Sequence, residues 1–268
     1  GVMKVYISAD MEGVTGVSHW DEVDHNKPQY AYFQEQMSKE VAAACEGATL
    51  SGAKEIYVKD AHYSARNIIP SYLPENVKII RGWSGHPYSM VQGLNNKFDA
   101  LMMVGYHSRA GSSSNPLAHT MSSAKIDEII LNEKPASELL LHGTVASKYH
   151  VPLVFVSGDF GICKEVKEIS PLTMTHSAMQ GIGNSTISIQ PELSRLKIKK
   201  KAEKALSLDL KSCIWAHPKK FKLELKYMKH VDAYKAAQYP GAMMLSPKRI
   251  VFENQDYDNI MRFVLFCV

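Results

Sequence analysis

A short apolar run near the start of the chain, Lys4–Ser8, leads almost directly into two acids, Asp10 and Glu12. A run of this length is typical of a strand buried in a parallel sheet. Side chains two residues apart on an extended chain point the same way, so both carboxylates are predicted to lie together where the strand ends. Ligands bind at that edge of open α/β sheets. Because adjacent carboxylates repel each other, we expect a metal ion between them, and two ions in preference to one.

Two other apolar runs end in residues of the same chemical kind. Glu55–Lys59 is followed by Asp60 and His62, and Ala100–Val104 is followed by His107. Taken singly, each of these residues has an ordinary interpretation as a polar loop residue that faces solvent. Because equivalent ends of parallel strands meet at one edge of a sheet, we expect all of them to contribute to one shared site.

Two candidates lie outside the strand ends. Glu138 is near the start of a predicted helix, Ser137–Lys148, where an acid would also complement the helix dipole. His119 lies at the far end of the loop that begins at His107. Taken alone, it fits either a loop histidine or a catalytic group.

Strand-like runs alternate with helical segments over the first part of the chain. The helical pattern is clearest at Tyr32–Ser51, and Gly52 predicts where that helix ends. We expect strands near Lys4–Ser8, Glu55–Lys59, Lys78–Arg81, Ala100–Val104, Lys125–Leu131 and Val151–Ser157. This alternation predicts an α/β fold with a mainly parallel sheet flanked by helices and a smaller C-terminal α+β part.

The character of the sequence changes after Pro171. Lysine becomes more frequent and clear strand–helix pairs become fewer. We therefore predict an α/β metal-binding domain at residues 3–170 and a smaller part at residues 171–268, with a soft boundary between about 160 and 190. The elements expected in the second part are helices at Glu192–Ser207, Val231–Ala237 and Asp256–Phe266 and a strand at Phe221–Met228.

Composition excludes several classes of protein. The four cysteines lie far apart with no Cys-x-x-Cys pair, which argues against a cysteine zinc site or a disulfide framework. No run approaches the ~20 apolar residues of a membrane span, and no secretory leader precedes the first strand. We therefore expect a cytoplasmic protein without membrane contact.

The net charge of +4 is modest, and lysines concentrate at residues 197–204 within a predicted helix. A solvated helix face explains them better than a nucleic-acid surface does, so no nucleic-acid partner is expected. The apolar residues predicted to form the buried stripe of this helix are Leu193, Leu196, Ala202, Ala205 and Leu206.

Two loop-like segments have alternative interpretations. Ser108–Pro116 connects two site candidates, and it fits either a mobile lid or an ordinary surface loop. Gln180–Thr186 is rich in glycine, but it lacks the spacing of a nucleotide-binding loop and a preceding predicted strand. We therefore exclude a nucleotide site there.

Five sequence motifs together resemble the bacterial and archaeal D-aminopeptidases, which are dinuclear zinc peptidases associated with dipeptide-transport operons. The resemblance is clear from Lys4 to about Asp159 and weaker from there to Val268. The motifs that carry it are Lys4–Val17, Lys59–His62, Val104–His107, Ala118–Met121 and Ser137–Leu139. The family carries basic residues where this chain has Gln180 and Asn184, so substrate contacts from that segment are in doubt.

The resemblance implies a role for each matching residue. Asp10 would bridge two Zn²⁺ ions. Glu12 and His62 would complete one metal, and His107 and Glu138 the other. His119 matches the proposed catalytic histidine of the family. The resemblance also implies that the C-terminal part completes the substrate pocket, and that copies of the chain form closed rings, as in the decamer of the best-known member.

The chemistry of the residues agrees with these roles. Zinc binds imidazole and carboxylate and leaves positions open in catalytic sites, and two metals can share a carboxylate and a hydroxide that attacks the scissile bond. The resemblance, and not the spacing of these residues, implies a zinc aminopeptidase that cleaves short peptides with an N-terminal D-residue. Manganese or iron would also accept this ligand set. The alternatives are a non-catalytic peptide-binding component of a transport system and a two-metal hydrolase of a non-peptide substrate.

Overall fold

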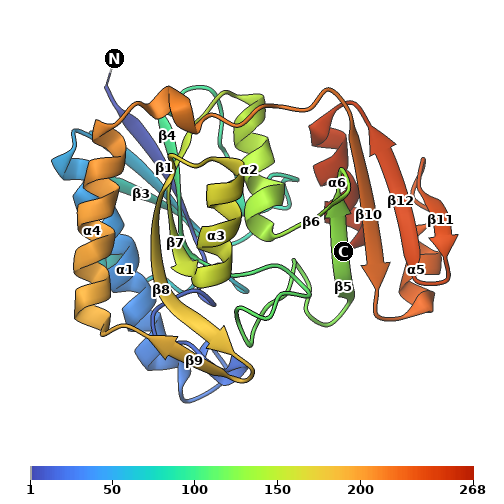
Figure 1. The fold of residues 1–268 in the computed structure, drawn as a ribbon, viewed down its shortest axis with the longest axis horizontal. Coiled ribbons are helices and arrows are strands. Elements are labelled where there is room, and N and C mark those ends of the chain that lie inside the picture. The colour runs from blue at the N-terminus through green and yellow to red at the C-terminus, as the bar shows by residue number, and fades with distance from the viewer. Residues whose placement is uncertain (1) are drawn as a thin grey trace.

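The computed structural model describes residues 2–268, which form two sheets. The strands of the larger sheet are β1 (Lys4–Ala9), β2 (Glu55–Asp60), β3 (Val77–Ile80), β4 (Ala100–Tyr106), β7 (Leu153–Asp159), β8 (Met174–Ile182) and β9 (Ser185–Ser188). Those of the smaller sheet are β5 (Ile126–Leu131), β6 (Lys134–Pro135), β10 (Phe221–Tyr227), β11 (Met243–Ser246) and β12 (Arg249–Asn254). Figure 1 shows the two sheets side by side.

The larger sheet has the order β3-β2-β1-β4-β7-β8-β9. All of its neighbouring strands run parallel except β9, which pairs with β8 as an antiparallel hairpin. The smaller sheet has the order β11-β12-β10-β5-β6 and is antiparallel throughout. The predicted α/β fold with a mainly parallel sheet is confirmed.

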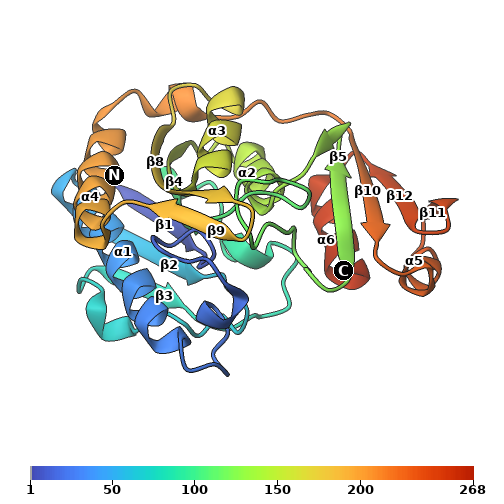
Figure 2. The ribbon, with the colours of Figure 1, turned by 60° about the horizontal axis from the view of Figure 1, so that its bottom comes forward.

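The helices are α1 (Tyr30–Leu50), α2 (Glu138–Lys148), α3 (Phe160–Ile169), α4 (Pro191–Ser207), α5 (His230–Ala236) and α6 (Tyr257–Cys267). Helices α1 and α4 pack on each other and on one face of the larger sheet, whereas α2 and α3 cover the other face (Figure 1). Figure 2 shows α6 between the smaller sheet and the rest of the molecule. Among residues 2–268, no helix is both long enough and apolar enough to cross a membrane.

Alternate residues of β1 enter two different cores. Val5 and Ile7 pack with α1 and α4, whereas Tyr6 packs with the core that α2, α6 and the smaller sheet share. Because β1 lies between β2 and β4, the strands that follow β1 first extend the sheet on one side of it and then on the other. Ligands bind at such a switch point in α/β sheets, so the fold places the end of β1 at the centre of the expected site.

The domain boundary predicted near residue 170 stays a prediction. In the structure, β8, β9 and α4 lie with the larger sheet although they follow residue 170. Conversely, β5 and β6 precede that residue and lie in the smaller sheet. Each layer is therefore built from both parts of the chain.

Helix α3 is not predicted from the sequence. Asp159 ends β7 and also caps α3, because its side chain accepts a hydrogen bond from the backbone N–H of Ile162 at 2.8 Å. A strand residue that doubles as a helix cap leaves no loop between the two elements. The sequence before Phe160 therefore lacks the loop residues that usually mark the start of a helix.

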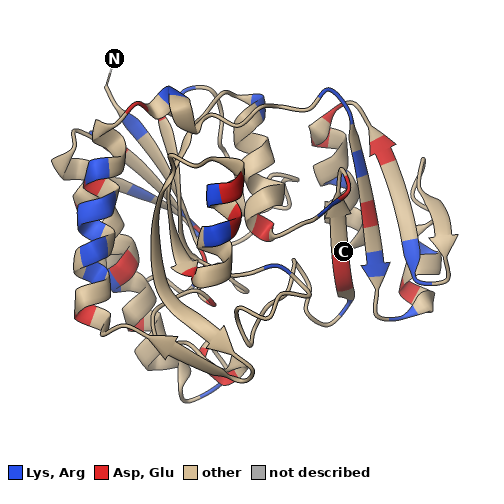
Figure 3. Ribbon diagram, viewed as in Figure 1, with Lys and Arg blue, Asp and Glu red and all other residues tan. Residues whose placement is uncertain are grey.

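The buried stripe predicted for α4 was partly wrong. Leu193 and Leu196 are 44% and 47% exposed. The buried residues are instead Ser194, Ile198, Ala202, Ala205 and Leu206. The reason is the close approach of α1, where a Cβ on Gly47 would lie 2.2 Å from the carbonyl oxygen of Lys199. Small residues must face α1 at this contact, and the lysines lie along the outer side (Figure 3).

Helix α1 carries a buried carboxylate, that of Glu40. The Oε2 atom of Glu40 accepts a hydrogen bond from the backbone N–H of Thr15 at 3.1 Å, whereas Oε1 has no partner among residues 2–268. Burial raises the pKa of Glu40 to about 7. The folded state therefore holds this proton more tightly than the unfolded state does, and the associated stability is lost as the pH rises through about 7.

We expect Glu40→Gln to stabilise the fold at pH 8 by about 3 kcal/mol, because each unit of pKa shift corresponds to about 1.4 kcal/mol. At pH 5, where Glu40 is already protonated in the fold, the change should be small. The difference in unfolding free energy between variant and wild type, measured by urea denaturation at both pH values, checks this. Glu46→Gln, at an exposed position of the same helix, is the matched control. An equal effect at the two pH values would contradict the argument.

Candidate metal centre

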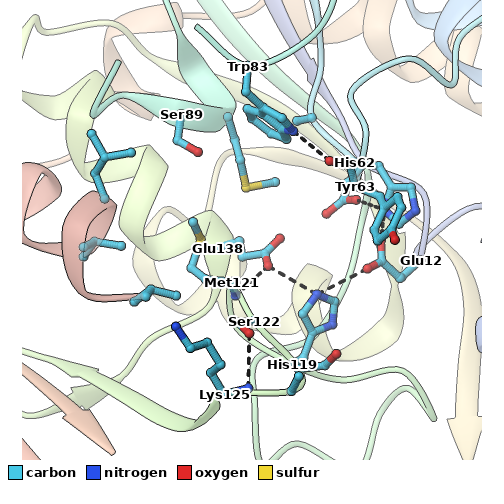
Figure 4. Close-up of a pocket in the computed structure, with 18 of the residues that line it drawn as sticks. Glu12, His62, Tyr63, Trp83, Ser89, His119, Met121, Ser122, Lys125 and Glu138 are labelled. Carbon is cyan, nitrogen blue, oxygen red and sulfur yellow. Dashed lines mark hydrogen bonds and ion pairs between the residues drawn. The ribbon is translucent and has the colours of Figure 1, made fainter. Parts of the chain in front are cut away.

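The six residues to which the resemblance assigns a role come together in the structure, and all are buried. Four of them lie just after the ends of β1, β2 and β4, whereas Glu138 begins α2 and His119 lies in the loop between β4 and β5. All except His107 line one cavity (Figure 4). The six are Asp10, Glu12, His62, His107, His119 and Glu138.

Asp10 lies between two histidines. Its Oδ1 is 3.3 Å from Nδ1 of His62, and its Oδ2 is 3.3 Å from Nε2 of His107. Nδ1 of His62 is also 2.9 Å from Oε1 of Glu12, and Nε2 of His107 is 3.0 Å from Oε1 of Glu138. Two clusters of three candidate ligands therefore share Asp10, each with its ligand atoms within 4.8 Å of one another.

His119 lies within reach of the same carboxylates. Its Nε2 is 3.3 Å from Oε2 of Glu12 and 3.5 Å from Oε2 of Glu138. Its ring stacks on that of His107 with the centroids 4.2 Å apart. With Glu12 and His107 it forms a third cluster that could hold a metal. Geometry alone therefore allows His119 either a ligand role or a role beside the ligands.

Two glycines explain why the motifs around these residues have their sequence. A Cβ on Gly13 would lie 1.8 Å from the carbonyl oxygen of Tyr106, and one on Gly105 would lie 2.3 Å from that of Asp10. Gly105 also has a φ of 72°, which favours glycine. Only glycine lets the ends of β1 and β4 approach closely enough to bring Asp10 and His107 together.

Two further strand-end acids organise the loops that carry the histidines. Asp60 accepts hydrogen bonds from the backbone and side chain of Asn67 and from the backbone of Ile68, which fixes the loop after His62. The sequence predicts that Asp60 contributes to the shared site, but Asp60 belongs to none of the candidate metal clusters. Its contacts show that it positions the loop.

Asp159 has the equivalent role for the loop after His107. It accepts hydrogen bonds from the backbone and hydroxyl of Ser108 and from the side chain of Asn115. Asn115 also donates to the backbone carbonyl of Glu12. Both ends of the Ser108–Pro116 segment are therefore anchored, which favours the surface-loop interpretation over a lid.

Each histidine of the site has one ring nitrogen committed to a backbone carbonyl. The contacts are 2.7 Å for Nε2 of His62, 2.9 Å for Nδ1 of His107 and 2.8 Å for Nδ1 of His119. A nitrogen that faces a carbonyl must carry a proton and donate it. The other nitrogen then points at the carboxylates and can offer its lone pair to a cation, the arrangement usual for metal-binding histidines.

The donor set fits a divalent cation. Oε1 of Glu12 is buried and accepts no hydrogen bond from residues 2–268, although Nδ1 of His62 lies only 2.9 Å away. A buried carboxylate oxygen without a hydrogen bond, beside an imidazole nitrogen, is suited to a metal ion bound between the two once the ring is deprotonated. Buried carboxylates and imidazoles are also the ligands that zinc takes in catalytic sites.

The carboxylates of the site differ in how readily they ionise. Burial and the neighbouring Glu12 raise the pKa of Asp10 to about 7. Burial opposes ionisation of Glu12, but the charges on His62 and His107 outweigh it and hold the pKa of Glu12 well below its usual range. Burial also opposes ionisation of Glu138, but His107 lowers its pKa to about 2. Glu12 and Glu138 are therefore anionic at neutral pH.

The imidazoles of His62 and His107 face these carboxylates and bind protons more tightly than usual. Burial disfavours the charged form of both rings, yet the facing acids raise the pKa of His62 and of His107 well above the usual range. A cation that binds here must displace those protons, because ligating imidazoles are neutral. Metal affinity should therefore increase with pH.

The cavity beside the six residues has a volume of about 620 Å³. Aromatic side chains line it on one side and residues of α6 on another. Sequence reasoning singled out none of these residues, which are Trp20, Tyr63, Trp83, Met261, Val264 and Leu265. Wall residues of this kind have no shared spacing or motif, so the sequence carries no signal for them.

A buried lysine holds one of these walls. Nζ of Lys59 lies 4.0 Å from the centroid of the Trp83 ring and donates hydrogen bonds to the carbonyls of Asp60 and Gly82. The indole N–H of Trp83 donates to the carbonyl of Tyr63 at 2.7 Å. These contacts fix the indole as a rigid side of the cavity.

Known proteins resemble this chain along its length. The model of one protein family, described as D-aminopeptidase, matches residues 3–266. A D-aminopeptidase of Bacillus subtilis (strain 168) is 34% identical over 185 residues, which is 69% of this chain and 66% of the relative, slightly under two thirds of its length. A solved structure, the Zn-dependent D-aminopeptidase DppA from Bacillus subtilis, described as a self-compartmentalizing protease, matches with a TM-score of 0.92 at 28% identity. That match covers 99% of this chain and 96% of that chain.

Proposed function

The chain belongs to the D-aminopeptidase family, and on that premise we propose that it is a zinc-dependent aminopeptidase that removes an N-terminal D-residue from short peptides. The observation that carries the proposal is the position of Asp10 between two histidines, with each of its oxygens facing a different imidazole. A carboxylate placed in this way can bridge two metal ions. A module that only binds peptides has no need of such a pair.

Five residues would hold the two zinc ions. Asp10 would be shared, Glu12 and His62 would complete one cluster, and His107 and Glu138 the other, as in the two clusters that share Asp10. Two zinc ions bound there would supply hydroxide at neutral pH and polarise the scissile carbonyl.

His119 is assigned the proton-handling role. Leu117 fixes the proton on Nδ1, so Nε2 faces the carboxylates at the cavity. From there it can carry a proton to the leaving amine or stabilise the oxyanion. The aromatic side chains and α6 form other walls of the cavity.

The chain is also proposed to assemble with copies of itself into a closed ring, as the description of DppA as self-compartmentalizing suggests. Exposed apolar side chains follow one another from the β8–β9 hairpin into α4, the largest of them Ile182, Ile187, Leu193 and Leu196.

Buried, free cysteines fit a cytoplasmic location. A link to dipeptide transport stays a prediction of the resemblance.

Metal removal tests the proposed function. We expect elemental analysis to find about two zinc per chain and the D-alanyl amide, not its L-isomer, to be cleaved. A chelator should abolish cleavage, and added zinc should restore it, because the hydroxide depends on the metals. Bound zinc with neither amide cleaved would move the substrate outside this class. Failure to retain or rebind any metal would leave a peptide-binding role as the better account.

A further inference from the structure

The cavity has opposite charges at different places on its wall. Asp10, Glu12 and Glu138 face it at the proposed metal site. Among the residues that line it, Lys125 is the one lysine or arginine. A ligand with a positive and a negative end would therefore bind in one orientation.

The backbone at Lys125 is held in place just before β5. Its N–H donates to the hydroxyl of Ser122 at 3.2 Å, and its carbonyl accepts from the N–H of Met228 at 2.9 Å. Figure 4 shows the side chain extending from this segment into the cavity, on the side of Met121. The ammonium group thus faces the cavity from a fixed point on the smaller sheet.

This ammonium group has no acidic partner within residues 2–268. Nearby Lys226 pairs with Asp127 at 3.0 Å, but no carboxylate lies within 4.0 Å of Nζ of Lys125. Lysine is a flexible point charge with three donors, and here those donors are available to a ligand. An internal salt bridge therefore does not explain why lysine occupies this position.

A short peptide in its free-acid form has the matching charges. An aminopeptidase must hold the amino end of its substrate beside the metal ligands, where the acids of this cavity lie. The carboxyl end then extends toward the rest of the cavity, whose 620 Å³ is within the usual range for a small ligand. Trp83, Met261 and Leu265 line the same cavity and offer an apolar surface to a substrate side chain.

We infer that Lys125 binds the C-terminal carboxylate of the substrate and so selects very short peptides with a free carboxyl group and an apolar second residue. This inference rests on the proposed function and adds to it a residue that determines substrate length. Longer peptides and C-terminally blocked peptides would lack a carboxylate at this position.

The test compares D-alanyl-D-leucine with its C-terminal amide. We expect wild type to prefer the free peptide by about tenfold in kcat/KM, as a charge-assisted contact allows. Lys125→Met should lose about this factor on the free peptide, mainly through KM, and leave the amide unchanged. Lys248→Met, an exposed lysine in the β11–β12 turn of the same sheet, should change neither. Equal losses on both substrates, or none, would overturn the inference.

A second measurement separates this inference from the proposed function. If wild type cleaved neither peptide, the proposed function would fail, but thermal unfolding still reports binding. The free peptide should then raise the Tm of zinc-loaded wild type more than the amide does, and Lys125→Met should remove that difference. Equal Tm shifts from the two ligands in wild type would contradict the contact between Lys125 and the carboxylate, whichever reaction the protein catalyses.

Discussion

Asp10→Ala is expected to lose both zinc ions and to reduce kcat/KM by about four orders of magnitude, because the metals supply both the nucleophile and the electrophile. Both candidate clusters include this carboxylate. Its removal would leave two ligands in each cluster and would place the protonated imidazoles opposite each other. Elemental analysis of the purified variant, beside cleavage of the D-alanyl amide, measures the two effects together.

Two controls separate metal loss from misfolding. Asp24→Ala removes another acid that lines the cavity but belongs to none of the clusters, so its zinc content should equal that of wild type. The Tm of Asp10→Ala should match that of chelator-treated wild type if only the metals are missing. Full zinc content in Asp10→Ala would show that this carboxylate does not bridge.

The residues directly after strands could be predicted from sequence alone. Asp10, Glu12, His62 and His107 each follow an apolar run, and parallel strands bring their carboxyl ends to one edge. The structure places all four there. Their positions follow from the short-range pattern of the strands and from the rule that parallel strands share an edge.

Glu138 and His119 could not be placed in the same way. Each has an ordinary local interpretation, as a first-turn acid and as a loop histidine, and only the resemblance gave each of these two candidates a definite role. In the structure, α2 begins under the site because Ser137 caps it through the N–H of Leu140. That position depends on how α2 packs on the sheet, which no local pattern records.

The wall of the cavity was beyond prediction for a different reason. Lys125 and Met261 reach it from the smaller sheet and from α6, which are separated by more than a hundred residues of sequence. The pairing of β5 with β10 brings these segments together. Pairing between distant strands is not encoded in the spacing of either one, so β5 could be predicted as a strand but not assigned to its sheet.

His119→Ala is expected to keep about two zinc per chain and to reduce turnover by about 10³-fold, the middle of the usual range for a group that transfers a proton in the transition state. The metal count decides between the two roles that geometry allows, because Nε2 of His119 lies 3.3 Å from Glu12 and could itself be a ligand. His25→Ala, at an exposed histidine outside the cavity lining, should change neither quantity. A drop to one zinc per chain would make His119 a ligand and overturn the catalytic assignment.

The leaving group then distinguishes the two ways in which His119 could act. An amine expelled from a peptide needs a proton, whereas p-nitroaniline is a much better leaving group and needs little help. If His119 carries the proton, His119→Ala should lose far more activity on D-alanyl-D-leucine than on D-alanyl-p-nitroanilide. If it stabilises the oxyanion, both substrates should lose a similar factor, because both form the same tetrahedral oxygen. The stacking of His119 on His107 keeps Nε2 in place. Because the carbonyl of Leu117 holds the proton on Nδ1, Nε2 has a lone pair that can take up a proton and pass it on, so we expect the first outcome.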